Sequence, residues 1–403
     1  MTKAPLQSFD DALASLLAAA ATVSGTESVP TLEALGRVVA NDLHSTINVP
    51  PADNTQMDGY ALKVADLGGA AGVRLRVGQR IPAGHIGATL DPGTAARIFT
   101  GAFIPAGADA VVMQEQVRVD GEYAVFDHLP RAGEWIRRAG EDIAEGSVIL
   151  SAGTRLSPQA LGLAASVGLA SIEVRRRLRV ACFFTGDELT MPGEPLRPGA
   201  IYNSNRFVLI GLLRTLGCEV LDLGIVPDSL EATREALRNA ATSSDLILTS
   251  GGVSVGEEDH VKPAVEAEGE LALWQIAMKP GKPLAFGRVR QSWFIGLPGN
   301  PVSSFVTFLL LVRPFLLRLQ GVSEVEAPRI AMRADFDWPR PDRRREFLRV
   351  SLNAGGGLDL FPNQSSGVLT STVRCDGLVD NPASRSIAAG DTVRFIPLTA
   401  LGA

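Results

Sequence analysis

Hydrophobic and polar positions follow different periods in successive zones of the 403-residue chain. Residues 1–45 carry leucine and valine at helical spacing, which predicts a helical segment. Residues 46–140 consist of short apolar runs separated by Pro, Gly and Asp, a pattern typical of a β-rich module. Residues 141–177 are mixed and contain a helix-like run at 157–167. We therefore predict a β-rich domain at 46–140, inserted into a discontinuous connecting domain made of 1–45 and 141–177.

From residue 178 to residue 323 the pattern alternates between strands and helices. Apolar runs predict strands at 178–184, 219–223, 245–249, 271–276, 284–286 and 293–295. Helical spacing predicts helices at 205–216, 230–240, 261–267 and 301–319. Such alternation is typical of a doubly wound α/β domain, in which helices cover both faces of a mainly parallel sheet. Residues 324–403 return to β-like runs, and we expect a small C-terminal β-barrel-like domain there.

Charge and cysteine content narrow the possible functions. A net charge of −6 argues against a nucleic-acid-binding surface, which normally needs clustered Lys and Arg. The arginine-rich stretch 340–349 is the exception, and we interpret it as a solvated or ion-paired strand edge. The 3 cysteines have no paired spacing, which indicates a reducing cytoplasm.

No secretory or membrane-spanning segment is expected. The alanine-rich run 12–21 directly follows two aspartates, which are the wrong charges for the start of a signal peptide. The apolar run 305–319 is interrupted by an Arg-Pro pair at 313–314 and is shorter than a membrane span.

Two glycine-rich loops, 249–256 and 296–304, each follow a predicted strand. Glycine allows positive φ and lets backbone N–H groups approach a ligand closely, so such loops suit anions. The second loop ends in an Asn-Pro pair at 300–301, which forms a favourable start for the following helix. A helix N-terminus beside Lys279 and Lys282, on a proline-flanked loop, predicts an oxyanion or phosphate site.

Carboxylates follow the same predicted strands. Glu188, Asp228 and Asp259 each come shortly after a strand, and the carboxyl ends of parallel strands meet at one crevice. Oxygen ligands of this kind suit Mg²⁺, although Asp228 could instead cap the helix that follows it.

Other chemistries lack the residues that they need. Ser254 fits the pattern of a nucleophile elbow, but His260 is the last histidine and follows too closely to complete a triad. The histidines show no zinc-ligand spacing, and no Walker A motif occurs.

Nine motifs resemble those of one family, in the same order. They are 57–60 (Met-Asp-Gly-Tyr), 100–102 (Thr-Gly-Ala), 107–115, 137–142 (Arg-Arg-Ala-Gly-Glu-Asp), 185–189 (Thr-Gly-Asp-Glu-Leu), 203–205 (Asn-Ser-Asn), 249–256, 279–283 and 296–304. The chain resembles the molybdopterin molybdenumtransferases, the family that includes bacterial MoeA and the gephyrin E domain, over nearly its whole length.

The resemblance implies an enzyme of molybdenum cofactor biosynthesis. Its substrates would be adenylylated molybdopterin and molybdate, and Mg²⁺-dependent release of AMP would accompany insertion of molybdenum. The implied assembly is an elongated, four-domain homodimer with its active cleft between subunits. The upstream molybdopterin adenylyltransferase is a further possible partner, and neither nucleic acid nor membrane is implied.

The resemblance also implies roles for individual residues. The positions that match catalytic ones are Asp58, Thr100, Asp142, Glu188, Asp228, Asp259, Lys279 and Lys282, with Glu188, Asp228 and Asp259 as metal ligands. The positions that match substrate-binding ones are Arg137, Thr185, Gly186, Asp187, Ser250, Gly251, Gly252, Ser254, Gly256, Pro298, Gly299, Asn300, Pro301, Ser303 and Ser371. Asp58 and Thr100 would face the cleft of the partner chain.

The chain departs from the family pattern at a few positions. Glu257-Glu258 stands where the family has Asp-Tyr, and Ser365 stands where it has glycine. Cys375-Asp376 replaces an Ala-Asn pair, so two of the departures lie in the C-terminal domain.

Three alternatives stay open on sequence alone. A molybdopterin adenylyltransferase would share the α/β domain but normally lacks the other zones. A non-catalytic scaffold could dispense with the acidic and basic site residues that this chain keeps. A paralogue that loads tungstate would use the same residues as one that loads molybdate.

Overall fold

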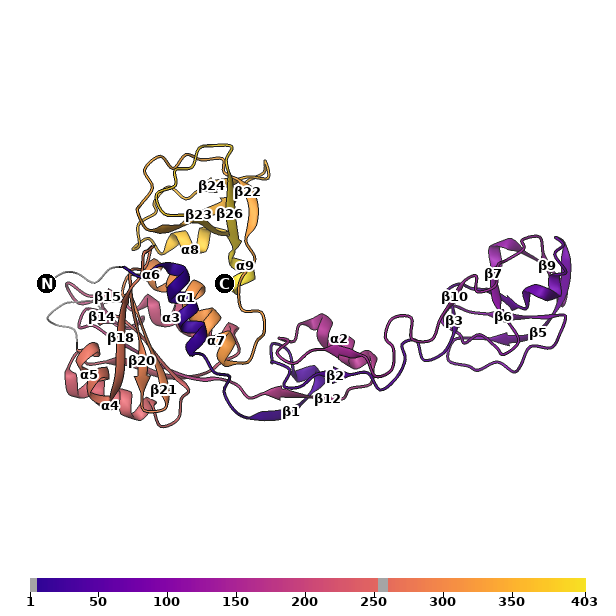
Figure 1. Ribbon diagram of the computed structural model, residues 1–403, viewed down its shortest axis with the longest axis horizontal. Helices are drawn as coiled ribbons and strands as arrows, with labels where there is room; N and C mark the ends of the chain where they lie inside the picture. Colours follow the sequence, from indigo (N-terminus) through magenta and orange to yellow (C-terminus); the bar gives the residue numbers. More distant parts are fainter. Residues whose placement is uncertain (1–5, 253–259) are drawn as a thin grey trace.

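The computed structural model describes residues 6–252 and 260–403 of the chain. The molecule is elongated (Figure 1). An α/β part and a C-terminal β part lie together at one end, a small mixed part lies in the middle, and a β-rich part forms the far end. The functional question is therefore which of these parts contribute to one site.

A six-stranded sheet forms the centre of the α/β part, with the order β16-β13-β17-β21-β20-β18. Four neighbouring strands are parallel: β16 (Glu219–Val226), β13 (Arg179–Thr185), β17 (Leu246–Ser250) and β21 (Ser292–Leu297). The remaining two, β20 (Pro283–Val289) and β18 (Gly269–Gln275), are antiparallel to their neighbours. The parallel strands β13 and β17 are almost wholly buried, which explains their continuous apolar sequences.

Helices cover both faces of this sheet, as predicted. Along β13, Val180 and Phe184 face one core while Phe183 faces another, because successive side chains of a strand point to opposite faces. The first core includes side chains of α1 (Phe9–Ala19), α3 (Ser204–Thr215) and the helix that begins at Pro301. The second is covered by α4 (Leu230–Ala240) and α5 (Val261–Glu268).

The helix predicted at 301–319 is present and continuous, and the Arg-Pro pair that interrupts the apolar run does not end it. It consists of α6 (Pro301–Thr307), a π-helical segment η4 (Phe308–Val312) and α7 (Arg313–Leu319). A proline inside an α-helix clashes with the carbonyl four residues earlier, and a π turn directly before it changes that spacing. The helix is long and apolar enough to cross a membrane by length and composition, but 89% of its apolar window is buried inside the protein. It is the main core helix of the α/β part.

The prediction of a helix throughout residues 1–45 is wrong beyond α1. Strand β1 (Thr26–Pro30) pairs with β12 (Ser171–Arg175), and β2 (Leu43–His44) pairs with β11 (Val148–Leu150). A single 3₁₀ turn, η1 (Thr31–Glu33), lies between β1 and β2.

The burial pattern of this segment shows why it is not helical. Leu32 and Leu35 are exposed, whereas the adjacent Val38 and Val39 are both buried. Pro30 and Gly36, the latter with φ of 72°, interrupt the apparent helical period. The predicted helix near 157–167 is present as α2 (Pro158–Ser166), capped by Ser157.

The far end is β-rich, as predicted. Its sheet has the order β7-β4-β6-β5-β9-β8. The strands are β4 (Gly59–Leu62), β5 (Val73–Ile81), β6 (Thr94–Ile98), β7 (Ala110–Met113), β8 (Val117–Asp120) and β9 (Tyr123–Phe126). Short turns η2 (Val64–Leu67) and η3 (Gln114–Gln116) connect them, and β3 (Asn54–Thr55) pairs with β10 (Ile136–Arg137) where this part joins the middle one.

The C-terminal sheet has the order β19-β23-β25-β26-β22, with β24 paired to β23. Its strands are β19 (Met278–Lys279), β22 (Ile330–Arg333), β23 (Arg345–Leu352), β24 (Leu358–Leu360), β25 (Gly377–Asn381) and β26 (Thr392–Pro397). Helices α8 (Thr370–Arg374) and α9 (Leu398–Leu401) complete it. The edge strand β19 comes from the α/β part of the sequence, and its pairing with β23 places Lys279 opposite Glu346.

Candidate active site

A cavity of about 1090 Å³ lies where the parallel strands of the central sheet end. The loops after β13, β17 and β21 line one side, as expected from the positions of carboxyl strand ends. The segment 201–205 and Asp228 also belong to the lining, and the loop 279–283, Arg344, the loop 364–367 and Leu369 complete it. The cavity is therefore shared between the α/β part and the C-terminal part.

Two glycine loops form the backbone wall of the cavity. Gly251 and Gly252 follow β17 with φ of 97° and 63°, a region that other residues rarely adopt. A Cβ atom at Gly251 would lie 2.7 Å from the backbone oxygen of Thr185, so the chain approaches too closely for any side chain there. The Cβ position of Gly299 lies 3.9 Å from the Cα atom of Gly251, which shows that the two loops touch.

Ser250 and Asn205 hold these loops together. The Ser250 hydroxyl donates to the backbone oxygen of Pro298 at 2.9 Å and accepts from the Asn205 amide at 2.9 Å. The same Asn205 nitrogen donates to the backbone oxygen of Gly299 at 2.8 Å. Sequence reasoning noted the motif that contains Asn205 but did not select this residue for the site.

The helix N-terminus also faces the cavity. Asn300 is its N-cap and Pro301 its first residue, and both line the cavity together with Ser303. The Asn300 side chain makes no capping hydrogen bond to this helix. The N–H group of Val302 donates instead to the backbone oxygen of Ser366 at 3.0 Å, which joins the helix start to the C-terminal loop. The positive end of the helix dipole is thus available to an anion.

Two of the three predicted metal ligands line the cavity, Glu188 and Asp228. The alternative that Asp228 caps α4 is wrong, because Ser229 is the N-cap and accepts from the N–H group of Ala232. Asp228 instead accepts a hydrogen bond from the Thr185 hydroxyl at 3.1 Å. Asp187 does not line the cavity in the described part of the chain, and its backbone oxygen accepts from Arg197.

The third predicted metal ligand, Asp259, lies outside the described residues, as do Ser254, Gly256 and the Glu257-Glu258 pair. Within 6–252 and 260–403 no group of three or more His, Cys, Asp or Glu side chains could hold a metal ion.

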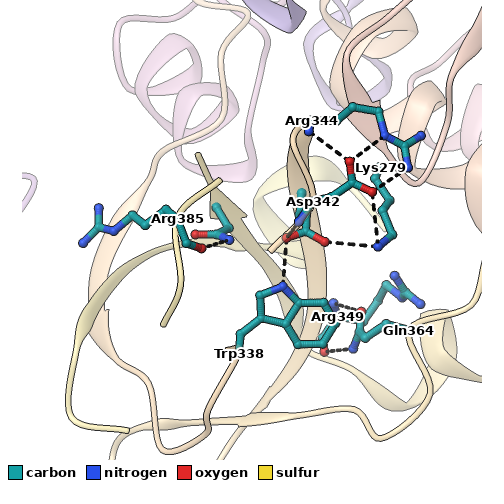
Figure 2. A network of polar contacts seen from close by, with 9 residues as sticks. Lys279, Trp338, Asp342, Arg344, Arg349, Gln364 and Arg385 are labelled. Atoms are coloured by element: carbon teal, nitrogen blue, oxygen red, sulfur yellow. Dashed lines mark hydrogen bonds and ion pairs between the residues drawn. The ribbon is translucent and has the colours of Figure 1, made fainter. Parts of the chain in front are cut away.

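Lys279 belongs to a network of charged side chains at the edge of the cavity (Figure 2). Its ammonium lies 3.2 Å from a carboxylate oxygen of Glu346 and 3.6 Å from one of Asp342. Asp342 also pairs with Arg344, which lines the cavity, at 2.8 Å. The hydrogen bonds from Arg344, supported by the charge of Lys279, hold the pKa of Asp342 well below its usual range.

Lys282 lines the cavity from the same loop as Lys279, and among the described residues no acid pairs with it. The arginine-rich stretch is ion-paired at Arg344 and Arg345, as interpreted from the sequence, but the interpretation as a strand edge is wrong because β23 lies between β19 and β25. Arg349 is different, because it is buried without a carboxylate partner among the described residues, and burial lowers its pKa to about 10.

Arg349 supports the C-terminal loop of the cavity from behind. Its guanidinium donates to the backbone oxygens of Asn363 and Ser365 and to the Ser371 hydroxyl. Ser371 is fully buried and donates to the backbone oxygen of Val368, so it does not line the cavity in this chain. Sequence reasoning did not place Gln364, Ser366 or Gly367 in the site, and the altered family motif was the only signal that pointed to them.

Comparison with known proteins gives matches over nearly the whole chain. Models of the MoeA N-terminal region (domain I and II), a probable molybdopterin binding domain and the MoeA C-terminal region (domain IV) match residues 7–168, 181–318 and 331–398. The chain is 41% identical over 384 residues to the molybdopterin molybdenumtransferase of Haemophilus influenzae, covering 93% of this chain and 95% of that protein. The chain belongs to the molybdopterin molybdenumtransferase family.

Other relatives and solved structures support the same family. The molybdopterin molybdenumtransferase 2 of Mycobacterium tuberculosis is 36% identical over 383 residues, with 92% of this chain and 95% of that protein covered. A crystal structure of a molybdopterin biosynthesis moeA protein from Pyrococcus horikoshii has a TM-score of 0.86 at 28% identity and covers 98% of this chain and 100% of that one. The predicted family, the predicted fold class and the prediction that the chain is an enzyme are confirmed. The family acts in molybdenum cofactor biosynthesis.

Four of the predicted site residues belong to segments other than those that line the described cavity. Asp58 directly precedes β4, Thr100 follows β6 and Arg137 lies in β10, three strands of the far end (Figure 1), whereas Asp142 lies between β10 and β11. In the described part of the chain, none of them lines the cavity.

Asp58 and Thr100 nevertheless form an ordered pair of their own. One Asp58 oxygen accepts from the backbone N–H of Thr100 at 2.8 Å and from its hydroxyl at 2.7 Å. These bonds, the backbone one first, lower the pKa of Asp58. The carboxylate is therefore held in a fixed direction on a half-buried loop.

Proposed function

We propose that this chain transfers molybdenum from molybdate to adenylylated molybdopterin and releases AMP with the help of Mg²⁺. The observation that supports this reaction is the single cavity shared by three kinds of group. The first is the pair of glycine loops, whose backbone adopts positive φ at Gly251 and Gly252. The second is the carboxylates Glu188 and Asp228, and the third is the cationic side chains Lys279 and Arg344. A substrate with two phosphates, a divalent metal and an oxyanion would need all three.

The glycine loops and the start of the 301–319 helix suit the phosphates of the substrate. Gly251 and Gly299 bring two backbone loops into contact, and a phosphate beside them would meet the positive end of the helix dipole. Ser303, which is almost fully buried at this helix start, supplies a hydroxyl at the same place. The main chain would thus bind and orient the diphosphate without a protein nucleophile, because an oxygen of molybdate or of water can cleave it.

A different edge of the cavity suits a flat ring. Strands β14 (Leu189–Thr190) and β15 (Ile201–Tyr202) place Leu189, Ile201 and Tyr202 in its lining, and the last two are 57% and 45% exposed. Beside them Asn203 is 2% exposed, and its amide nitrogen has no hydrogen-bond partner among the described residues. An apolar surface next to a buried N–H donor is suited to a pterin, whose ring carries a carbonyl oxygen.

Mg²⁺ fits the two carboxylates that the cavity contains. Glu188 and Asp228 both supply oxygen, and Mg²⁺ is usually held by one or two carboxylates together with substrate phosphates. When bound, the ion would neutralise charge on the phosphates and polarise the bond that breaks. Thr185 would keep the Asp228 carboxylate oriented through its hydroxyl.

A complete site would need a second copy of the chain. Asp58 is held rigidly by Thr100 on a half-buried loop, but no residue of 46–140 lines the described cavity. In the proposed homodimer, this loop of one chain would face the cavity of its partner. We place the activity in the cytoplasm, because Cys182, Cys218 and Cys375 are all free and buried.

The deciding experiment is measurement of AMP release from adenylylated molybdopterin and Mg²⁺, with and without micromolar molybdate. Release that depends on molybdate and falls strongly in Lys279→Ala would support the proposal. Tight binding without release would contradict it and favour a scaffold. Replacement of molybdate by tungstate in the same assay would measure the preference between the two oxyanions.

The shared cleft has its own test. Inactive Asp58→Ala and Asp228→Ala proteins, mixed and allowed to exchange subunits, should regain part of the activity, because a heterodimer contains one intact cleft. Absence of recovery after proven exchange would contradict a site built from two chains.

A further inference from the structure

Lys279 is attached to the C-terminal part by its backbone as well as by its side chain. Strand β19 leaves the α/β part and pairs in parallel with β23, which sets Lys279 directly opposite Glu346. The two residues are 67 positions apart in the sequence. The orientation of this cavity lysine therefore depends on a residue from another part of the molecule.

Glu346 is a fully buried carboxylate whose two oxygens have separate partners. One oxygen accepts from the indole N–H of Trp338 at 2.8 Å and from the backbone N–H of Asp342 at 3.0 Å. The other accepts from the Lys279 ammonium at 3.2 Å. Two neutral donors thus fix the direction of the carboxylate, and its remaining oxygen is presented to the lysine.

We propose that Glu346 is a positioning residue that holds the Lys279 ammonium at the cavity edge, where it meets the oxyanion. The identity of that oxyanion as molybdate rests on the proposed function. A lysine side chain has four flexible carbon–carbon bonds, and a buried carboxylate removes much of this freedom before the ligand arrives. Lys279 remains 39% exposed, so the ion pair does not hide its charge from the cavity.

A neighbouring acid provides a matched comparison. Asp380, on β25 opposite Phe347, is also buried and pairs with Arg329 and Arg345. Neither of those arginines lines the described cavity. Replacement of either acid by its amide removes one buried negative charge from the same sheet, but only the change at Glu346 releases a cavity lysine.

The first test measures the reactivity of Lys279 and needs no substrate. The protein, its Glu346→Gln variant and its Asp380→Asn variant are treated briefly with an amine-acetylating reagent, and acetylation is quantified by mass spectrometry. We expect Glu346→Gln to raise acetylation of Lys279 several-fold relative to Lys282. Asp380→Asn should leave that ratio unchanged. Equal ratios in all three proteins would overturn the proposal.

The second test measures whether Glu346 acts through Lys279. In the AMP-release assay, Glu346→Gln should raise the KM for molybdate about 10-fold and change kcat less. Glu346→Asp, which keeps the charge, should restore part of the loss. In the Lys279→Ala background, whose residual release is measured at high enzyme and molybdate concentrations, the Glu346→Gln change should add nothing, since the group that it positions is gone.

The outcomes separate the two proposals. An equal loss from Glu346→Gln with and without Lys279, or a fall in kcat alone, would overturn the positioning role. If the unaltered protein releases no AMP with molybdate, the proposed function fails, while the acetylation ratio still decides whether Glu346 positions Lys279.

Discussion

The two walls of the cavity present different chemical groups to a ligand. The α/β wall presents mainly backbone, at Gly251, Gly252 and Gly299, with few charged side chains. The C-terminal wall presents Lys279 and Arg344, each held by a carboxylate. Backbone groups at strand ends are fixed by the sheet itself, whereas charged side chains need partners to hold them. A ligand that touches both walls is therefore bound by geometry on one side and by charge on the other.

This difference predicts how each wall responds to substitution. On the C-terminal wall, loss of one acid changes the position of a cation but leaves the fold in place. On the α/β wall, an added side chain has no room, because the two glycine loops touch each other. The carboxylates Glu188 and Asp228 line the α/β wall. They bring charge to a part of the cavity whose backbone is fixed by the sheet, and Thr185 also holds Asp228.

The largest effect is expected from Asp228→Asn. The amide can still accept the hydrogen bond from Thr185, so the change removes charge and little else. If Asp228 helps to hold Mg²⁺, AMP release should fall by about 100-fold or more. The assay is AMP release at saturating molybdate over a range of Mg²⁺ concentrations, and part of the loss should be recovered at high Mg²⁺.

Asp222→Asn is the matched control for this change. Asp222 lies on β16 and pairs with Arg206, and it does not line the described cavity. Its amide variant should keep nearly full activity at every Mg²⁺ concentration. Equal losses in the two variants would show that the charge of Asp228 has no special role.

The next effect separates steric crowding from backbone strain on the α/β wall. Gly251 and Gly224 both have positive φ, of 97° and 69°, so alanine is strained at either position. Only at Gly251 would the new methyl group collide, 2.7 Å from the Thr185 oxygen, whereas nothing lies within 4 Å at Gly224. We expect Gly251→Ala to lower AMP release by about 10-fold to 100-fold, because a shift of about 1 Å in a site can have that cost.

Gly224→Ala should cost only about 1 kcal/mol of stability and leave activity nearly unchanged. Thermal unfolding measured beside the activity assay distinguishes the two. If both variants lose stability alone, the backbone wall does not depend on the close contact of its loops.

The two walls also differed in how far the sequence could predict them. Each loop of the α/β wall directly follows its own strand, so local patterns placed Thr185, Ser250 and Gly299 at one edge of the sheet. The C-terminal wall depends on β19 pairing with β23, which joins Lys279 to a residue 67 positions away. No local period encodes such a pairing, and Glu346 could not be distinguished from any other acid in an arginine-rich stretch.

The differences between the predicted and the observed fold also have local causes. The spacing of Leu32 and Leu35 resembles one face of a helix, yet both are exposed. The helix at 301–319 was predicted with its full length, but the π turn inside it, at Phe308–Val312, has no sequence signal of its own. Asp228 was open to two interpretations, and only the contacts showed that Ser229 is the cap.

A smaller effect is expected where a side chain joins the two glycine loops. Asn205→Ala removes the hydrogen bonds to Ser250 and to the backbone of Gly299, but the sheet still holds both loops. We therefore expect AMP release to fall about 5-fold to 10-fold, corresponding to about 1–1.5 kcal/mol, with the KM for the pterin substrate rising. Asn239→Ala, at an exposed position of α4, is the control and should behave like the unaltered protein. An unchanged KM in Asn205→Ala would show that the loops need no side chain to stay together.

The smallest effect on activity is expected at the opposite end of the central sheet, where Asp245 precedes β17. Burial would raise the pKa of Asp245, but hydrogen bonds from Arg176 and from the backbone of Arg179 lower it overall. A lowered pKa in the folded state means that the unfolded chain binds protons first as the pH falls below about 4. The stability that this ion pair contributes is therefore complete at neutral pH and is lost as the pH falls through the folded-state pKa.

Asp245→Asn should lower the free energy of unfolding by about 1–3 kcal/mol at pH 7, and by less in acid. Thermal unfolding across pH 3–7 would measure this difference. Because this charge lies away from both walls, AMP release at a permissive temperature should change less than 2-fold, and a larger loss would show that the two ends of the sheet are coupled.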